Sequence, residues 1–257
     1  MAGTAQVDVT GRTVLVTGGT KGIGYAIAES FLAAGADVVV CGRTAPERLA
    51  TADGRSAEFV ATDVRDPEQA AALVAETVRR TGRLDVLVNN AGGSPDADAA
   101  TVSPRFVEKI VQLNLLGPFY VAQAANRVMQ QQDDGGAIVN IGSVSAHDPQ
   151  PGTAAYSAAK AGLLMFSRAL ALEWAPKVRV NHITTGLIRT EAAATVYGAD
   201  GGAAVAELIP MHRMATPADV ANACLYLASD LAAYVTGADL AVHGGGEVPA
   251  RYVVTRS

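Results

Sequence analysis

A tyrosine and a lysine stand four positions apart, at Tyr156 and Lys160, in a segment whose apolar pattern predicts a helix. Side chains at this spacing lie on one face of a helix, one turn from each other. A free phenol has a pKa of about 10, and a nearby ammonium lowers that pKa toward the range in which protons exchange at neutral pH. The pair therefore indicates proton transfer, although Tyr and Lys at this spacing are common in helices and other features must agree.

A hydroxyl side chain follows a predicted buried strand upstream of this pair. The apolar run Ala137–Ile141 is typical of a parallel strand, and Ser143 stands two residues beyond it. Doubly wound α/β folds bind their ligands at the carboxyl ends of such strands. Ser143 is therefore expected to face a ligand.

A glycine-rich segment joins the first predicted strand to the first predicted helix, and it reads Thr17-Gly18-Gly19-Thr20-Lys21-Gly22-Ile23-Gly24. Glycines permit a tight turn and let the backbone approach a pyrophosphate, while the amides at the helix start favour negative charge. In this position the segment predicts a dinucleotide site.

The identity of the dinucleotide depends on the residue that ends the second predicted strand. NAD enzymes place an acid about 20 residues past the glycine segment to hold the ribose hydroxyls, but the residue 18 positions after Gly24 is Gly42, followed by Arg43. With no acid to repel a 2′-phosphate, and with Lys21 and Arg43 able to bind it, NADP(H) is favoured. NAD(H) remains the alternative, in which both cations are solvated surface residues.

These residues need a scaffold, and the chain alternates short β-branched runs with longer amphipathic stretches. The predicted strands are Thr13–Thr17, Asp37–Cys41, Glu58–Ala61, Leu84–Asn89, Ala137–Ile141, Val178–Ile183 and Asp239–Val242. The predicted helices are Ile23–Ala34, Pro67–Thr81, Arg105–Gln132 with a break at Pro118, Tyr156–Glu173 and Pro217–Ala228. The pattern predicts an α/β fold, a doubly wound Rossmann-type three-layer sandwich with a seven-stranded parallel sheet.

One region interrupts this alternation. Residues 188–216 are rich in Ala and Gly and show only a weak helical pattern. A lid over the site and an ordinary surface loop are both open interpretations. With no linker elsewhere, residues 1–257 are expected to form one domain that carries this substrate-loop region.

Composition restricts the partners. The chain has 257 residues, with 20 Lys and Arg against 25 Asp and Glu and a formal net charge of −5, so nucleic acid is an unexpected partner. No signal-peptide pattern and no spanning apolar run occurs, which predicts a soluble, cytoplasmic protein without membrane contact. Cys41 and Cys224 are expected to be buried free thiols, and the four scattered histidines give no metal-site spacing.

The chain resembles the short-chain dehydrogenases/reductases from Gly11 to Gly246. Gly18, Gly22 and Gly24 fit the glycine motif of that family, the 13 residues from Ser143 to Tyr156 match its Ser-to-Tyr spacing, and Asn114 matches its helix asparagine. The resemblance implies a hydride transfer between a nicotinamide cofactor and a small carbonyl or alcohol. It assigns Ser143 to a hydrogen bond on the substrate oxygen, Tyr156 to the proton, Lys160 to the nicotinamide ribose and Asn114 to a bound water.

Further cofactor contacts are implied by the resemblance alone. They are Asp63 and Val64 after the third predicted strand, Asn90 to Gly92 after the fourth, and Gly186, Ile188 and Thr190 after the sixth. The motifs toward the C-terminus are most similar to bacterial 3-oxoacyl carrier-protein reductases, and the family suggests a homo-oligomer, a tetramer.

Several positions depart from the family pattern. Thr185 replaces a proline beside the cofactor, His243 replaces an aspartate near the C-terminus, and Gly142 replaces a common serine. His147, four residues past Ser143, is interpreted as a solvent-facing loop residue.

Alternative functions differ in chemistry from a carbonyl reductase. A non-catalytic nucleotide-binding or redox-sensing protein is disfavoured by the complete Asn-Ser-Tyr-Lys set. An NAD-dependent alcohol dehydrogenase stays possible, and a nucleotide-sugar epimerase would need an added domain. The substrate is undetermined because the residues that select it lie in Ser94–Ala100, Ala146–Thr153 and Thr190–Thr216.

Overall fold

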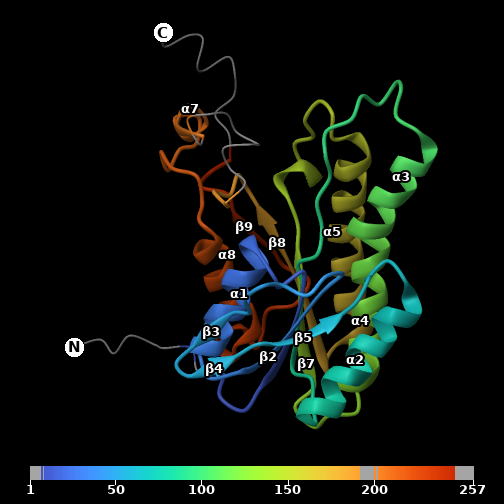
Figure 1. Ribbon diagram of the computed structural model, residues 1–257, viewed down its shortest axis with the longest axis vertical. Coiled ribbons are helices and arrows are strands. Elements are labelled where there is room, and N and C mark those ends of the chain that lie inside the picture. Colours follow the sequence, from blue (N-terminus) through green and yellow to red (C-terminus); the bar gives the residue numbers. More distant parts are fainter. Residues whose placement is uncertain (1–6, 8, 192–199, 201, 247–257) are drawn as a thin grey trace.

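The computed structural model describes residue 7, residues 9–191, residue 200 and residues 202–246. In this part of the chain seven strands form one sheet in the order β5-β2-β1-β6-β7-β8-β9, with every neighbouring pair parallel (Figure 1). The strands are β1 (Thr13–Thr17), β2 (Asp37–Gly42), β5 (Glu58–Ala61), β6 (Val86–Asn89), β7 (Gly136–Ile141), β8 (Val178–Thr185) and β9 (Asp239–Val242). The predicted parallel sheet is confirmed.

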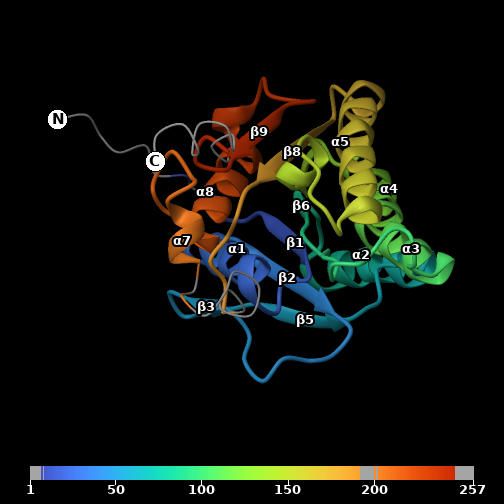
Figure 2. The ribbon, with the colours of Figure 1, turned by 90° about the horizontal axis from the view of Figure 1, so that it is seen from above.

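Helices cover both faces of the sheet, which gives the predicted three layers (Figure 2). On one face lie α1 (Gly22–Ala33) and α8 (Pro217–Ala228), and on the other lie α2 (Pro67–Thr81), α4 (Gly117–Met129) and α5 (Ala154–Trp174). Side chains alternate between these faces along each strand, so Val14 and Val16 pack toward α1 and α8 while Leu15 packs toward α2 and α4. Burial on both faces explains why the strands are almost entirely apolar.

Helix formation around Pro118 differs from the prediction. The break expected at Pro118 is wrong, because α3 (Pro104–Val111) runs through the π-helical turn η1 (Gln112–Leu116) into α4 with helical backbone angles at both junctions. The wider turn accommodates a proline that would clash with a regular α-helix. Pro118 stands at the start of α4, where its missing N–H costs little.

Several short elements lie outside the seven predicted strands and five predicted helices. A small antiparallel hairpin, β3 (Thr51–Ala52) and β4 (Arg55–Ser56), follows β2. The turns η2 (Val144–Ala146) and η3 (Asp230–Ala232) follow β7 and α8. In the region 188–216, Ile188 pairs with Ala215 and α7 (Ala203–Ala206) forms one short turn, while residues 192–199 and 201 lie outside the described residues.

The strand order reverses between β1 and β6. From β1 the chain continues outward to β2 and β5, and from β6 it continues in the opposite direction to β7, β8 and β9. The crevice at the carboxyl ends of two strands that diverge in this way is where open α/β sheets bind ligands. The fold therefore places the glycine segment after β1 and the Asn-rich segment after β6 at the same crevice.

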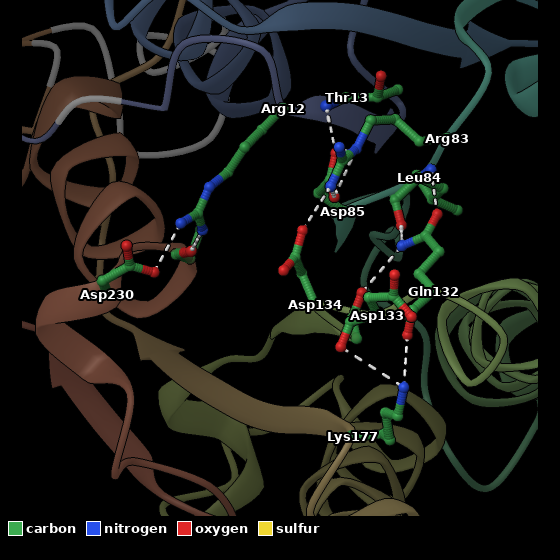
Figure 3. Close-up of polar contacts among 12 residues, drawn as sticks. Arg12, Thr13, Arg83, Leu84, Asp85, Gln132, Asp133, Asp134, Lys177 and Asp230 are labelled. Carbon is green, nitrogen blue, oxygen red and sulfur yellow. Dashed lines mark hydrogen bonds and ion pairs between the residues drawn. The ribbon is translucent and has the colours of Figure 1, made fainter.

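Polar contacts connect the strands at the other end of the sheet, where the strands begin (Figure 3). Asp85 accepts the N–H of Thr13 at 2.7 Å and pairs with Arg83, which joins the starts of β1 and β6. Gln132 bonds both backbone groups of Leu84 at 2.9 Å. These contacts satisfy strand ends that would otherwise be unpaired, and they leave the carboxyl edge open for a site.

No helix in the described ranges is long and apolar enough to cross a bilayer.

Candidate functional site

The glycine segment after β1 is joined directly to the chain after β6. Thr17 Oγ1 accepts the backbone N–H groups of Asn90 and Ala91, both at 3.0 Å. Asn90 Nδ2 in turn donates to the carbonyls of Thr17 at 2.9 Å and Gly18 at 3.1 Å. Asn90, which the resemblance placed at the cofactor, thus fixes the position of the glycine segment relative to the neighbouring strand.

Close packing makes a glycine necessary at the start of α1. A Cβ on Gly24 would lie 2.3 Å from the carbonyl oxygen of Gly18 and 2.4 Å from Asn90 Nδ2. The first turn of α1 has no side-chain cap and no acidic residue. Its amides are therefore available to an anion, and the residues present fit the pyrophosphate of a dinucleotide.

Lys21 and Arg43, the two cations that the sequence suggested for a 2′-phosphate, are both exposed. Lys21 precedes α1 and Arg43 follows β2, and neither forms an ion pair with a described residue. Gly42 lies beside Thr20, whose Cγ2 would be 3.4 Å from an added Cβ. Position 42 carries no acidic side chain, and the carboxylate that interacts electrostatically with Arg43 is that of Asp63.

Asp63 does not stand alone at the end of β5. Its carboxylate forms a two-point ion pair with Arg65, a partner that the sequence analysis did not identify. The Arg65 hydrogen bond lowers the pKa of Asp63. The carboxylate is therefore ionised and held in one orientation.

Other residues implied by the resemblance approach the site from several segments. Thr190 Cγ2 lies 3.7 Å from the place of a Cβ on Gly22, so the chain after β8 returns to the glycine segment. Ile188 is buried and Val64 is buried beside Gly117. Gly186 donates to the carbonyl of Val242 at 3.0 Å, and the backbone of His243 leaves no room for a side chain there.

Lys160 is buried, with only 3% of its surface exposed. Its Nζ donates to the carbonyl of Ile141 at 2.7 Å and lies 5.7 Å from the centre of the Tyr156 ring. Burial lowers the pKa of Lys160 to about 8, because an ammonium group loses its hydration there. A Cβ on Gly92 would lie 3.3 Å from this Nζ, which places the chain after β6 against the same group.

Asn114, in the π-helical turn η1, is fully buried, and its side-chain amide forms three hydrogen bonds within the protein. Oδ1 accepts the N–H of Gly93 at 2.8 Å, while Nδ2 donates to the carbonyls of Gly93 and Ile110, both at 3.0 Å. The side chain therefore fixes the loop after β6 against η1. The carbonyl of Asn114 has no i+4 donor, because that position is Pro118.

Asn89 supports this turn from inside the sheet. Its Nδ2 donates to the carbonyl of Pro118 at 3.0 Å and to Asn140 Oδ1 at 2.9 Å, and Asn140 Nδ2 donates to Ser167 Oγ at 2.9 Å. This buried chain of bonds links β6 and β7 to α4 and α5. Motif spacing does not predict this network, but polar residues inside otherwise apolar strands are the pattern in the sequence that indicates it.

Ser143 lies where the sequence predicted, directly after β7. Its Oγ accepts the N–H of Ser145 at 3.2 Å and begins the turn η2, which packs against α5. Among the described residues no acceptor takes its O–H. Ser143 therefore keeps a donor for another molecule.

A group of polar residues, which we call the Asp239 cluster, lies beneath the chain that carries Ser143. Asp239 Oδ1 contacts His182 Nδ1 at 2.8 Å and accepts from Thr184 Oγ1 at 2.7 Å, and Asp239 Oδ2 contacts His147 Nε2 at 3.0 Å. His147 is exposed, as interpreted from the sequence, but it is also paired. The cluster attaches the loop after Ser143 to β9.

Protonation in the Asp239 cluster follows from burial. Burial would raise the pKa of Asp239, but hydrogen bonds from His182 and Thr184 hold it well below its usual range. Burial lowers the pKa of His182, more than its bond to Asp239 raises it. His182 is therefore neutral, with the Nδ1 proton directed at the carboxylate.

The two departures at positions 142 and 185 belong to this arrangement. A Cβ on Gly142 would lie 2.0 Å from His182 Cε1, so the imidazole occupies the space of a side chain at position 142. Thr185 Oγ1 donates to the carbonyl of Gly142 at 2.8 Å. Thr185 and His182 together hold the residue that immediately precedes Ser143.

In the described ranges no three His, Cys, Asp or Glu side chains form a group that could hold a metal ion.

We predict that Gly142→Ser lowers both stability and turnover, because its Cβ has no space beside His182. Overpacking of this kind costs about 1–3 kcal/mol. The double variant Gly142→Ser/His182→Ala should recover most of the loss, since the imidazole is then gone. Urea denaturation and the kcat of each variant measure the effect, with His182→Ala alone as the control. Equal losses in the single and double variants would contradict the argument.

We also predict a stability change with pH that belongs to Lys160. Its pKa is about 8 in the folded chain and 10.5 in the unfolded chain, so between these values only the unfolded chain holds the proton and the free energy of unfolding rises with pH. Relative to Lys160→Met, the wild type should gain up to about 3 kcal/mol across this window.

The two buried thiols oppose this rise, but they are present in both proteins and cancel in the difference. Chemical denaturation at pH 7.5, 9 and 10.5 gives the values, and Lys109→Met on exposed α3 is the matched control. A difference that stays flat with pH would show that Lys160 keeps its ordinary affinity for the proton.

Known proteins share the sequence pattern and the fold of this chain. The family model described as enoyl-(acyl carrier protein) reductase matches residues 17–247. The 3-oxoacyl-[acyl-carrier-protein] reductase of Aquifex aeolicus is 36% identical, covering 93% of this chain and 99% of its own. Glucose 1-dehydrogenase 2 of Bacillus subtilis is also 36% identical, covering 93% and 95%.

Among solved structures, the aldohexose dehydrogenase of Thermoplasma acidophilum superposes with a TM-score of 0.86 at 31% identity, covering 94% of this chain and 96% of its own. Similarity of this extent includes every strand that forms the crevice. The chain belongs to the short-chain dehydrogenase/reductase family, and it is an oxidoreductase of alcohol and carbonyl groups.

Proposed function

We propose that the protein is an NADP(H)-dependent oxidoreductase that interconverts a ketone or 3-oxoacyl group and a secondary alcohol. The observation that carries the proposal is the buried Lys160 ammonium beside the Tyr156 ring. Gly92, in the segment that follows β6 at the crevice, lies next to this ammonium. Proton transfer at Tyr156 needs such a cation, and a nicotinamide needs such a crevice. When bound, the nicotinamide supplies the hydride that the carbonyl carbon takes up.

Two hydroxyl groups act on the substrate oxygen in this proposal. Ser143 donates a hydrogen bond through its O–H, which no described residue accepts. Tyr156 delivers a proton to the same oxygen as negative charge develops on it. In the oxidation direction the same tyrosine removes the alcohol proton.

Lys160 and Asn114 support Tyr156. The Lys160 ammonium favours the phenolate and lowers the barrier to proton release. It also lies where it would bind the nicotinamide ribose, in exchange for the carbonyl of Ile141. The side chain of Asn114 bonds Gly93 and Ile110, and its backbone carbonyl, which Pro118 leaves without an i+4 donor, is the group to which we assign a water able to return protons to Lys160.

The phosphate loop and its neighbours would hold the cofactor. Amides at the start of α1 would bind the pyrophosphate, and Lys21 and Arg43 would bind the 2′-phosphate. Gly18, Thr20, Gly22, Ile23, Gly24, Asp63, Val64, Asn90, Gly92, Gly186, Ile188 and Thr190 complete the proposed cofactor contacts.

A homo-oligomer, of which the family suggests a tetramer, is part of the proposal. Large apolar side chains are exposed at Met165 and Leu172 on α5 and at Leu231 and Tyr234 after α8. Exposed apolar surface of this kind favours subunit contacts. The mass in solution tests this, and a monomer at micromolar concentration would contradict it.

We predict that Tyr156→Phe lowers kcat by about 100-fold to 10,000-fold, the usual contribution of a positioned acid. The ring stays and only the hydroxyl is lost, so the dissociation constant for NADPH should change less than twofold. NADPH absorbance with a panel of ketones and NADPH fluorescence titration measure the two effects. Tyr120→Phe on α4 is the control, and a Tyr156→Phe enzyme with most of its activity would end the proposed mechanism.

We predict that Gly42→Asp moves the preference from NADPH toward NADH. The position has ordinary contact distances for an added Cβ, and a carboxylate there would repel the 2′-phosphate and accept from ribose hydroxyls. Arg43→Ala should lower kcat/KM for NADPH about tenfold and leave the value for NADH nearly unchanged.

Arg55→Ala, in the hairpin beyond β2, is the control and should alter neither ratio. Steady-state kinetics with both cofactors measure the change. A wild-type enzyme that strongly prefers NADH would remove the assignment of NADP(H).

A further inference from the structure

A cavity of about 220 Å³ opens beside Tyr156, between the loop after β6, α3 and the start of α5. We call it the α3 cavity. It is lined by Ser94, Ala97, Ala99, Val102, Phe106, Val107, Gly152, Ala154, Ala155 and Tyr156. The sequence analysis expected substrate-selecting residues at Ser94–Ala100 and Ala146–Thr153, and the structure adds the α3 residues Phe106 and Val107 to them.

Among the described residues that line it none has a charged side chain, and two of its polar groups are bonded inside the protein. The hydroxyl of Ser94 donates to the carbonyl of Pro95 at 2.8 Å, and the carbonyl of Gly152 accepts from Ala97 at 3.0 Å. Methyl groups and the Phe106 ring make up most of the remaining wall. A hydroxyl or a charge that displaces water from these apolar side chains meets few hydrogen-bonding partners among the described lining residues.

The position of the cavity connects it to the reaction. Tyr156 lines the cavity and is also the residue of the proposed proton transfer. A substrate whose carbonyl group is held at Tyr156 would therefore place one of its two arms in the cavity. A cavity of roughly 150 Å³ can hold benzene, so the volume of the α3 cavity suits a chain of about six carbons or a phenyl ring.

We propose that the substrate is a ketone, or the matching secondary alcohol, one arm of which is an apolar alkyl or aryl group that fills the α3 cavity. This rests on the proposed function and restricts it. We expect polyols and sugars to be poorer substrates, because the apolar lining offers few partners to hydroxyl groups on that arm. The second arm meets other walls of the crevice and is unrestricted by this cavity.

The test is a series of methyl ketones whose alkyl arm grows one carbon at a time, assayed with NADPH. Burying one methylene is worth about a fourfold gain in binding, so kcat/KM should rise about fourfold per carbon, reach a maximum near six and then fall. Acyclic polyol ketones of equal length should be turned over at least tenfold less efficiently. The same acyl arms on 3-oxo thioesters of N-acetylcysteamine show whether the second arm is a thioester.

Two variants relocate the maximum if the α3 cavity holds the arm. Val107→Trp should move it to the shortest ketones, and Phe106→Ala should move it to longer arms. Val107→Thr keeps the shape but adds a hydroxyl, and it should lower kcat/KM for the six-carbon ketone severalfold with little change for acetone. Val78→Thr on α2 is the matched control and should leave the series unchanged.

The outcomes separate the two proposals. A series without a maximum, a maximum that both variants leave in place, or better turnover of polyols would overturn the inference while the enzyme remains a carbonyl reductase. Failure to reduce any carbonyl, together with no effect of Tyr156→Phe on alcohol oxidation, would instead overturn the proposed function.

Discussion

The Lys160 ammonium group is almost completely buried, and the surrounding structure is organised by that constraint. Desolvation lowers its pKa to about 8, and the carbonyl of Ile141 at the end of β7 is its bonded partner within the described residues. A side chain at Gly92 would press on the ammonium, and the Asn114 side chain holds the neighbouring loop in place. The cost of burying this charge is a local loss of stability that the packed sheet offsets.

The position of that ammonium relative to a cofactor depends on the contact between two halves of the sheet. Thr17 and Asn90 join the chain after β1 to the chain after β6 through four hydrogen bonds. Gly92 lies two residues after Asn90, and a Cβ added to it would be 3.3 Å from Lys160 Nζ. A single short segment therefore sets the distance between the glycine segment and the residues that we propose for proton transfer, as preorganised catalytic groups would require.

The fold was predictable because its signals are local. Buried parallel strands such as β1 and β7 are continuous β-branched runs, and the helices between them repeat their apolar positions with a period near 3.6. Pro118 was misjudged for the opposite reason. Its effect depends on whether the preceding turn can widen. Asn114 in that turn bonds Gly93, and Asn89 bonds the carbonyl of Pro118, so the stabilising partners lie in segments distant in the sequence.

The candidate site was predictable only as far as its motif spacing. Tyr156, Lys160, Ser143 and the glycine segment follow from the printed sequence, but the partners that position them do not. Asp239 is 57 residues beyond His182 and 92 beyond His147, and no local pattern links residues so far apart. The pairing arises from the parallel register of β8 and β9, which sets His182 opposite Asp239.

The departures from the family pattern look independent in sequence and are connected in space. A histidine at position 182 fills the volume in which a side chain at position 142 would lie, so Gly142 is a consequence of His182. The imidazole in turn needs an acceptor for its Nδ1 proton, and Asp239 supplies it. Thr185 then bonds the carbonyl of Gly142, a contact that a proline at this position could not form. A side chain at position 142 would clash with the His182 imidazole, and a proline at position 185 would remove the donor to the carbonyl of Gly142, so these two departures are linked through the Asp239 cluster.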